Sequence, residues 1–131
     1  MSTDLTGKTA LVTGAGRGIG AATARGLSQA GASLVLVARS ADELADTAAA
    51  ITAAGGSGSV RTVTADLGDD TQRRRVIDTA LSGGTVDILI NNAATVEPLG
   101  ASTAIGPEEL RHAFDVNVIA VAALTAALVR A

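Results

Sequence analysis

Glycines are concentrated in one short segment, the eight residues from Thr13 to Gly20, which read TGAGRGIG. Glycine adopts positive φ freely and has no Cβ to hold a ligand away from the backbone. An alanine-rich helical segment follows, so its unpaired N–H groups and positive dipole end would face the same place. The segment therefore predicts a phosphate site, most simply for the pyrophosphate of a dinucleotide. A tight turn without a ligand is the alternative.

Two arginines stand where the ribose of such a dinucleotide would lie. Arg39 follows the apolar run 33–38, where a second strand would end, and Arg17 lies inside the glycine turn. A carboxylate there would bind a free 2′-hydroxyl, whereas guanidinium groups favour a 2′-phosphate, so the sequence favours NADP(H) over NAD(H). An exposed arginine without a role is the alternative for Arg39. Asp42 and Glu43 come soon after, but helix-dipole stabilisation in a first turn explains them.

The elements that would position these residues alternate along the chain. Apolar runs predict strands at 9–12, 33–38, 60–64 and 86–90, and amphipathic segments predict helices at 19–30, 41–54, 69–81 and from 107 onward. This βαβαβαβ alternation predicts an α/β fold with a parallel sheet, right-handed crossovers and helices on both faces. The pattern corresponds to half of a doubly wound domain.

Composition indicates a single packed domain. The chain has 131 residues, of which 47% are hydrophobic and 1% aromatic, so the core must consist of aliphatic side chains. The glycine- and serine-rich segment 55–59 lies where a helix must return to a strand and is predicted to be a loop, not a linker. Residues 1–131 are therefore expected to form one incomplete NAD(P)-binding domain.

Charge and cysteine content exclude several functions. A net charge of -3 argues against nucleic acid as a partner, and the basic run 73–75, flanked by acidic residues, is predicted to be a solvated helix face. Without cysteine and with one histidine, neither a disulfide nor a metal site is expected. No signal-peptide pattern precedes the first strand, and the most apolar stretch, 116–129, is shorter than the roughly 20 residues of a membrane span. A cytoplasmic protein without membrane contact is expected.

The spacing Thr-Gly-x-x-x-Gly-Ile-Gly, together with Asn91-Asn92-Ala93, resembles the short-chain dehydrogenase/reductase family over the whole chain. The resemblance implies a Rossmann-like doubly wound parallel sheet of order 3-2-1-4, truncated after about four strands and the following helix. It also implies that Gly14 makes the turn, Gly18 admits the cofactor and Gly20 lets the helix pack on the sheet. The cofactor-binding residues implied are Thr13, Gly14, Gly16, Arg17, Gly18, Ile19, Gly20, Arg39, Asp66, Leu67, Asn91 and Ala93.

Two of these residues lie at the ends of other strands. Asp66 matches the family's adenine-contacting aspartate, with Leu67 beside it, and a helix cap is the alternative for Asp66. Asn91 follows the fourth strand at the carboxyl edge of the sheet, where ligands bind in open α/β folds. In the family this Asn-Asn-Ala-Gly segment supports the sheet and touches the ribose, and Ala94 here replaces the usual glycine.

Asn117 is the one member of the family's catalytic set that the sequence contains. In helical projection it falls on a stripe with Leu110, Phe114 and Val121, so its amide is expected to be buried and hydrogen-bonded. The family's asparagine kinks this helix and holds a water in a proton relay, and a satisfied core amide is the alternative. His112 points away from the stripe and is predicted to be a surface residue.

The remaining catalytic chemistry is absent. In the resembled family a tyrosine donates the proton, assisted by a lysine and a serine beyond the next strand, but this chain has no tyrosine and only Lys8, at the opposite edge of the sheet. We expect the amino-terminal portion of an NADP(H)-dependent reductase of an unknown small alcohol or ketone, inactive alone. The family's interface helix implies a homo-oligomer. The alternatives are a non-catalytic nucleotide-binding or interaction module completed by a partner chain, and a remnant without a ligand.

Overall fold

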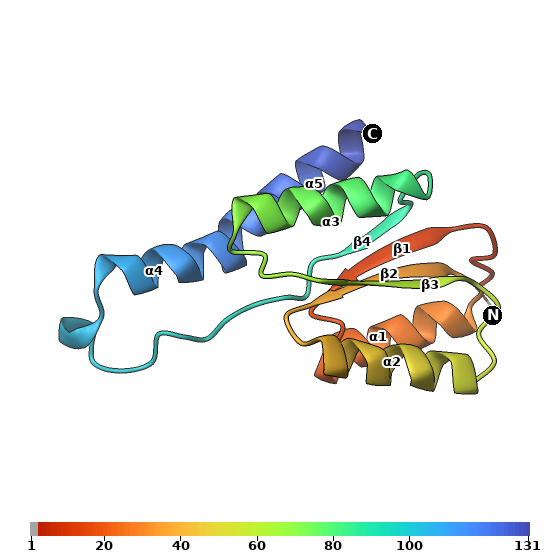
Figure 1. Ribbon diagram of the computed structural model, residues 1–131, viewed down its shortest axis with the longest axis horizontal. Helices are drawn as coiled ribbons and strands as arrows, with labels where there is room; N and C mark the ends of the chain where they lie inside the picture. Colours follow the sequence, from red (N-terminus) through yellow and green to blue (C-terminus); the bar gives the residue numbers. More distant parts are fainter. Residues whose placement is uncertain (1–2) are drawn as a thin grey trace.

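The computed structural model describes residues 3–131 as a four-stranded parallel sheet of order β3-β2-β1-β4, with helices on both faces (Figure 1). The predicted fold class and strand order are confirmed. The strands are β1 (Thr9–Thr13), β2 (Ser33–Ala38), β3 (Val60–Thr64) and β4 (Ile88–Ile90). The helices are α1 (Gly18–Gln29), α2 (Ala41–Ala53), α3 (Asp70–Ser82), α4 (Pro107–Phe114) and α5 (Ala120–Arg130), with a 3-10 turn at Ser102–Ala104 and a π-helical segment, η2, at Asp115–Ile119.

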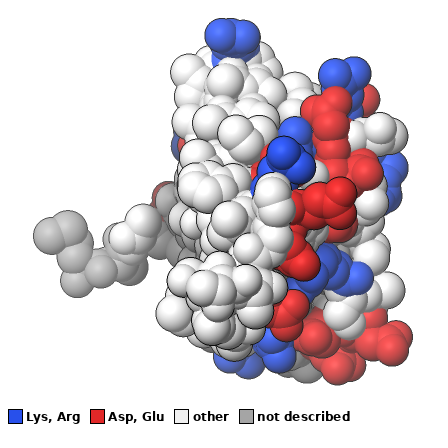
Figure 2. All heavy atoms as spheres, turned by 90° about the vertical axis from the view of Figure 1, so that its left-hand side faces the viewer, with Lys and Arg blue, Asp and Glu red and all other residues white. Residues whose placement is uncertain are grey.

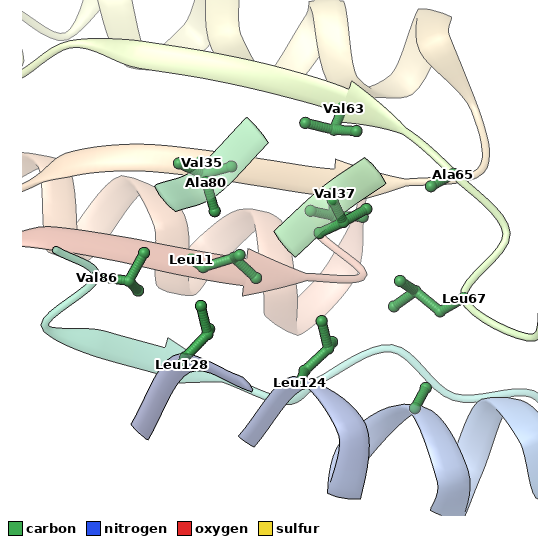
Figure 3. Packing of buried hydrophobic residues seen from close by; sticks show 12 residues of the cluster. Leu11, Val35, Val37, Val63, Ala65, Leu67, Ala80, Val86, Leu124 and Leu128 are labelled. Carbon is green, nitrogen blue, oxygen red and sulfur yellow. The ribbon is translucent and has the colours of Figure 1, made fainter. Parts of the chain in front are cut away.

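The central strands β1 and β2 are apolar on both faces because both faces are covered. Helices α1 and α2 lie on one side of the sheet and α3 and α5 on the other. Successive side chains of β2 point in opposite directions, so Leu34 and Leu36 pack toward α1 and α2, while Val35 and Val37 pack with Leu124 of α5 (Figure 3). Continuous apolar runs are typical of parallel strands buried in this way.

Capping residues begin and end the helices close to the predicted positions. The Ser40 hydroxyl accepts a hydrogen bond from the Glu43 N–H at 3.2 Å and begins α2, as its sequence spacing predicted. Gly31, with φ 99°, ends α1. Strand β4 begins at Ile88, two residues later than predicted, and just before it the Asp87 carboxylate accepts a hydrogen bond from the Thr9 N–H at 2.9 Å.

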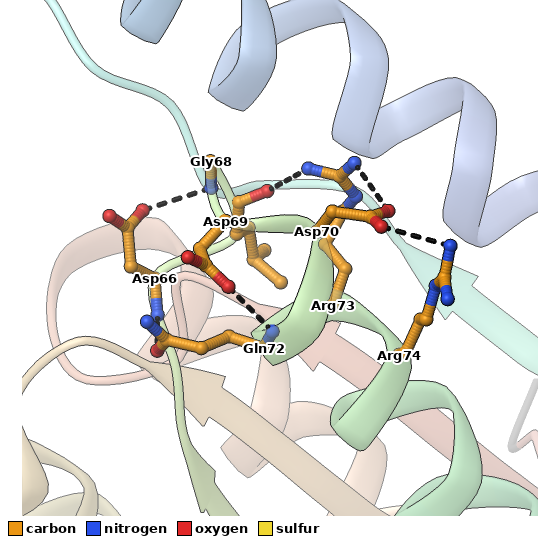
Figure 4. Close-up of polar contacts among 8 residues, drawn as sticks. Asp66, Gly68, Asp69, Asp70, Gln72, Arg73 and Arg74 are labelled. Atoms are coloured by element: carbon orange, nitrogen blue, oxygen red, sulfur yellow. Dashed lines mark hydrogen bonds and ion pairs between the residues drawn. The ribbon is translucent and has the colours of Figure 1, made fainter.

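The arginine run of α3 matches the predicted solvated helix face at Arg74 and Arg75, which are exposed, but not at Arg73. Arg73 is buried, and its guanidinium donates to the Leu67 carbonyl at 2.9 Å (Figure 4). Asp70 pairs with both Arg73 and Arg74, at 3.2 and 3.0 Å. Arg75 donates to the carbonyl of Thr64. Arg73 and Arg75 hold backbone carbonyls at the β3 to α3 connection, but only Arg73 is turned away from solvent, since Arg74 and Arg75 are exposed.

The stripe predicted for the last helix is also wrong. Leu110 and Phe114 are 45% and 60% exposed. The buried side of this helix consists of Val116, Ala120, Leu124 and Leu128. Only α5 packs along α3, whereas α4 extends beyond the sheet (Figure 1), and the π-helical turn between them changes which side faces the core.

The helical segment from Pro107 to Arg130 is long and apolar enough to cross a membrane by length and composition alone. It has 24 residues, and its most apolar window has a mean hydropathy of 1.8. The sequence prediction considered only 116–129 and therefore underestimated its length. Core helices of soluble proteins pass the same test, and Ala120, Leu124 and Leu128 of this helix lie in the core beside the sheet, so one such helix is weak evidence for a membrane span.

Candidate dinucleotide site

An open cleft of about 560 Å³ lies at the carboxyl ends of β1, β2 and β4. Its walls are the glycine turn, residues 38–40 at the end of β2, residues 92–94 after β4, and Glu43 of α2. After β1 the chain adds β2 and β3 on one side of it and then β4 on the other side, so the strand order reverses at β1. Ligands of open α/β sheets bind at such a reversal of strand order.

The glycines of the turn have distinct steric roles. Gly14 and Gly18 have φ of 64° and 60°, a conformation that side chains other than glycine rarely adopt. A Cβ at Gly18 would meet nothing within 4 Å, so its Cα faces open space. A Cβ at Gly20 would lie 2.0 Å from the Gly14 carbonyl oxygen, so only glycine lets α1 approach the turn.

The beginning of α1 is open toward a ligand. Its N-cap residue, Arg17, is extended and makes no side-chain capping hydrogen bond. The first-turn N–H groups and the positive end of the helix dipole are therefore available to an anion. Ile19 lines the same cleft with 77% of its surface exposed, which supplies an apolar contact. This arrangement fits a pyrophosphate group.

A buried hydroxyl beneath the cleft joins the turn to the end of β4. The Thr13 Oγ1 atom accepts hydrogen bonds from the N–H groups of Asn92 and Ala93, at 3.0 and 2.9 Å. The same hydroxyl donates to the Ile90 carbonyl at 3.3 Å, and Asn92 Nδ2 donates to the Gly14 carbonyl at 3.2 Å. Thr13 is 1% exposed, so its side chain supports the cleft from below and does not line it.

Thr47 of α2 holds the other side of the turn. Its buried hydroxyl is within hydrogen-bond distance of the carbonyls of Ala15 and Gly16, at 3.0 and 3.2 Å. Both carbonyls are thus turned toward α2, away from the cleft. Sequence reasoning missed Thr47 although a signal existed: it lies between Leu44 and Ile51 on the buried face of α2, where a hydroxyl needs a partner.

The charged residues of the cleft lie at its rim. Arg17 is 88% exposed, and its Nε lies 3.8 Å from Oε2 of Glu43. Arg39 is exposed, lines the cleft and forms no ion pair with any residue of 3–131. Figure 2 shows the end of the molecule toward which the strands run, where acidic and basic side chains alternate beside a broad area that carries neither. Ion pairs this exposed contribute little to stability, so the guanidinium groups remain available.

Five of the implied cofactor residues do not line the cleft: Thr13 and Gly20, described above, and Asp66, Leu67 and Asn91. Asp66 Oδ1 accepts a hydrogen bond from the Gly68 N–H at 2.9 Å, while Asp69 caps α3, so the helix-cap alternative for Asp66 is wrong. The Leu67 side chain is 5% exposed and belongs to the core. Asn91 Nδ2 donates to Thr125 Oγ1 at 3.2 Å, which directs its amide toward α5.

Asn117 is exposed, contrary to the prediction, but its amide is fully engaged. Its Oδ1 accepts from the Thr95 N–H at 2.8 Å, and its Nδ2 donates to the Thr95 carbonyl at 2.9 Å. The residue lies in the π-helical segment, so the irregularity expected at this position is present. His112 is exposed, and Lys8 lies 3.9 Å from Asp87 at the amino edge of the sheet, both as predicted.

The parallel sheet and its cleft define an α/β domain of the Rossmann class. The family model for short chain dehydrogenase matches residues 8–131. The chain therefore belongs to the short-chain dehydrogenase family, as the glycine spacing and Asn91-Asn92-Ala93 suggested.

Relatives and solved structures agree with this assignment. An uncharacterized oxidoreductase of Methylorubrum extorquens is 41% identical over 125 residues, which cover 94% of this chain and 49% of that protein. The structure of L-sorbose reductase from Gluconobacter frateurii, complexed with NADPH and L-sorbose, has a TM-score of 0.91 at 31% identity and covers 99% of this chain and 49% of its own. A metagenomic short-chain oxidoreductase in complex with NADP has a TM-score of 0.89 at 35% identity, covering 96% and 56%. The chain spans about half the length of the curated relatives it matches.

Proposed function

We propose that this chain binds NADP(H) in preference to NAD(H), as the cofactor-binding amino-terminal part of a reductase or dehydrogenase of small ketones or alcohols. The observation that carries the proposal is the uncapped glycine turn with Arg17 and Arg39 at its rim. Two solved relatives that contain NADPH or NADP support a nicotinamide dinucleotide as the ligand.

Each part of the nucleotide has a proposed place. Backbone N–H groups between Gly14 and Gly20 bind the pyrophosphate, and Arg17 and Arg39 bind the 2′-phosphate, because guanidinium groups hold phosphate oxygens in paired, charge-assisted hydrogen bonds. Asp66 and the Leu67 backbone border the adenine. After β4 we assign the ribose contact to Ala93, which lines the cleft, and not to Asn91, whose amide points toward α5.

A bound nicotinamide would supply hydride transfer, and the residues described above would only bind and orient it. Reduction of a ketone also needs a proton donor near the carbonyl oxygen. The 131 residues contain no tyrosine, and Lys8 lies at the opposite edge of the sheet. We therefore expect no turnover from this polypeptide alone, and we assign Asn117 a positioning role. Consumption of NADPH with a simple ketone by the purified chain, free of host reductases, would contradict this expectation.

Calorimetric titration tests the binding proposal. We expect NADPH to bind the 131-residue chain more tightly than NADH. Arg39→Ala should lower the affinity for NADPH by about tenfold or more, since hydrogen bonds to charged groups contribute about 1.5–3 kcal/mol. Binding of NADH should change by less than about twofold, because it lacks the phosphate that Arg39 would contact. Arg111→Ala, which removes another exposed positive charge, from α4 outside the cleft, is the control and should change the affinity for neither nucleotide. A chain that binds neither nucleotide would refute the proposal, and equal affinities would refute the preference.

A second candidate function is a nucleotide-binding or interaction module completed by another chain, either a second copy or a different protein. Strand β4 is an edge strand whose three residues are half-buried, and Leu110, Phe114 and Val118 leave an apolar face uncovered on the last helix. Light scattering on the purified chain tests this candidate. A dimer of fixed stoichiometry would favour completion by a second copy, and a monomer at all concentrations would oppose it. Co-purification of a different protein in fixed stoichiometry would favour completion by another chain. In either case we propose a soluble cytoplasmic protein with no nucleic-acid partner.

A further inference from the structure

Glu43 is the one carboxylate among residues 3–131 that lines the cleft. Its side chain lies directly against the glycine turn, because a Cβ at Gly16 would fall 2.9 Å from Glu43 Cβ and 3.3 Å from its Oε2. Its backbone N–H is fixed by the hydrogen bond to Ser40 Oγ. The sequence placed Glu43 in a first helical turn and explained it by the dipole alone. Asp42 has the same explanation but does not line the cleft.

We infer that Glu43 is a specificity-determining residue that competes with the 2′-phosphate for Arg17. The inference rests on the proposed NADP(H) site. In the free chain the carboxylate is Arg17's ion-pair partner, with 3.8 Å between Nε and Oε2. A 2′-phosphate that binds Arg17 must separate this pair or accept a carboxylate as its neighbour. Glu43 therefore lowers the preference for NADP(H) over NAD(H).

The charges at this corner determine the direction of the effect. Two guanidinium groups and one carboxylate leave one net positive charge, and neutralising Glu43 leaves two. A phosphate monoester carries about −1.5 to −2 charge at pH 7, so it gains from the change, whereas a free 2′-hydroxyl carries no charge to respond. Because the groups are exposed, a high effective dielectric limits the gain to roughly fivefold, and salt reduces it further.

The test uses ligands that isolate the 2′-phosphate. Adenosine 2′,5′-bisphosphate and 5′-AMP differ only in that group, and each is titrated calorimetrically into the 131-residue chain together with NADPH and NADH. Glu43→Gln should raise the affinity for the bisphosphate and for NADPH by about fivefold and change the affinity for 5′-AMP and for NADH by less than about twofold. Asp42→Asn also removes one negative charge from the first turn of α2, but outside the cleft, and should change all four affinities by less than about twofold. Circular dichroism verifies that each variant is folded.

The outcomes separate this inference from the function on which it depends. Failure of the unsubstituted chain to bind any of the four ligands refutes the NADP(H) site itself. If it binds but Glu43→Gln leaves the bisphosphate to AMP ratio unchanged, or acts no more strongly than Asp42→Asn, the competition is refuted. A ratio that rises because 5′-AMP weakens would also overturn it, since the carboxylate would then bind the 2′-hydroxyl. In an Arg17→Ala background the gain from Glu43→Gln should shrink, because the ion pair is gone and only the repulsion between carboxylate and phosphate remains. An undiminished gain would contradict competition for Arg17.

Discussion

The first half of the sheet and the last helix differ in how completely their apolar side chains are covered. In β1 and β2, Leu11, Val35 and Leu36 are fully buried between two layers of helices. On the last helix Leu110 and Phe114 are largely exposed, although they are equally apolar. The cleft is built mainly by the covered region, with the turn fixed by Thr13 and its neighbours from below. We therefore expect the proposed nucleotide binding not to depend on the exposed apolar side chains of the last helix.

Leucine truncations in the two regions should differ most. Leu36→Ala removes a side chain that is 0% exposed and should lower the free energy of unfolding by about 4 kcal/mol, within the range measured for buried leucines. Leu110→Ala, at a 45% exposed position, should cost less than about 0.5 kcal/mol. Urea unfolding of both variants measures the two values. Similar losses would mean that the last helix is covered and that the contrast between the regions is wrong.

Two glycines of α1 also differ in whether an added side chain would meet other atoms, so substitutions at them compare a covered and an open position beside the cleft. Gly20→Ala places a Cβ 2.0 Å from the Gly14 carbonyl oxygen and should cost about 3 kcal/mol, because overpacking against backbone cannot be relieved by a rotamer change. Gly26→Ala, in the same helix, meets nothing within 4 Å and should stabilise the chain by about 0.5–1 kcal/mol. Thermal unfolding distinguishes them. A tolerated Gly20→Ala would show that the turn can move away from α1.

Substitutions that release the loop after β4 should lower the free energy of unfolding less than those in the core. Asn117→Ala removes both hydrogen bonds to the Thr95 backbone and should cost about 1 kcal/mol, since the group is exposed and each bond contributes little net energy. Amide hydrogen exchange should show that Thr95 loses its protection. Asn91→Ala, which removes one bond to Thr125, should leave the exchange of Thr95 unchanged. Equal effects of the two substitutions would contradict a specific hold by Asn117.

Sequence patterns predicted the covered region well because burial constrains its residues. Strand β3 coincides with the prediction, α2 ends one residue earlier than predicted, and Ser40 caps α2 as its spacing suggested. The apolar runs of β1 and β2 are covered on both faces, and such runs are typical of buried parallel strands, so their pattern predicted strands directly. The strand order followed the family resemblance and agrees with the structure.

The remainder could not be predicted for physical reasons. A helical projection assumes a regular helix, and the π-helical segment Asp115–Ile119 changes the side that packs inward, so the stripe through Phe114 was misassigned. Charged sequence runs are normally solvated, and nothing in the sequence indicated that Arg73 would turn inward to the Leu67 carbonyl. The position of Thr47 on the buried face of α2 indicated that its hydroxyl needs a partner, but that partner, the glycine turn, lies about thirty positions away, which local patterns do not reveal.

The most direct test of the account is a map of backbone amide shifts by nuclear magnetic resonance during titration of the 131-residue chain with NADPH. If the glycine turn receives the pyrophosphate, the largest shifts will fall on amides between Gly14 and Gly20 and on Arg39, with little change in α3 and α5. Saturable shifts centred on the last helix, or none at the glycine turn at a concentration that saturates binding, would contradict the central claim.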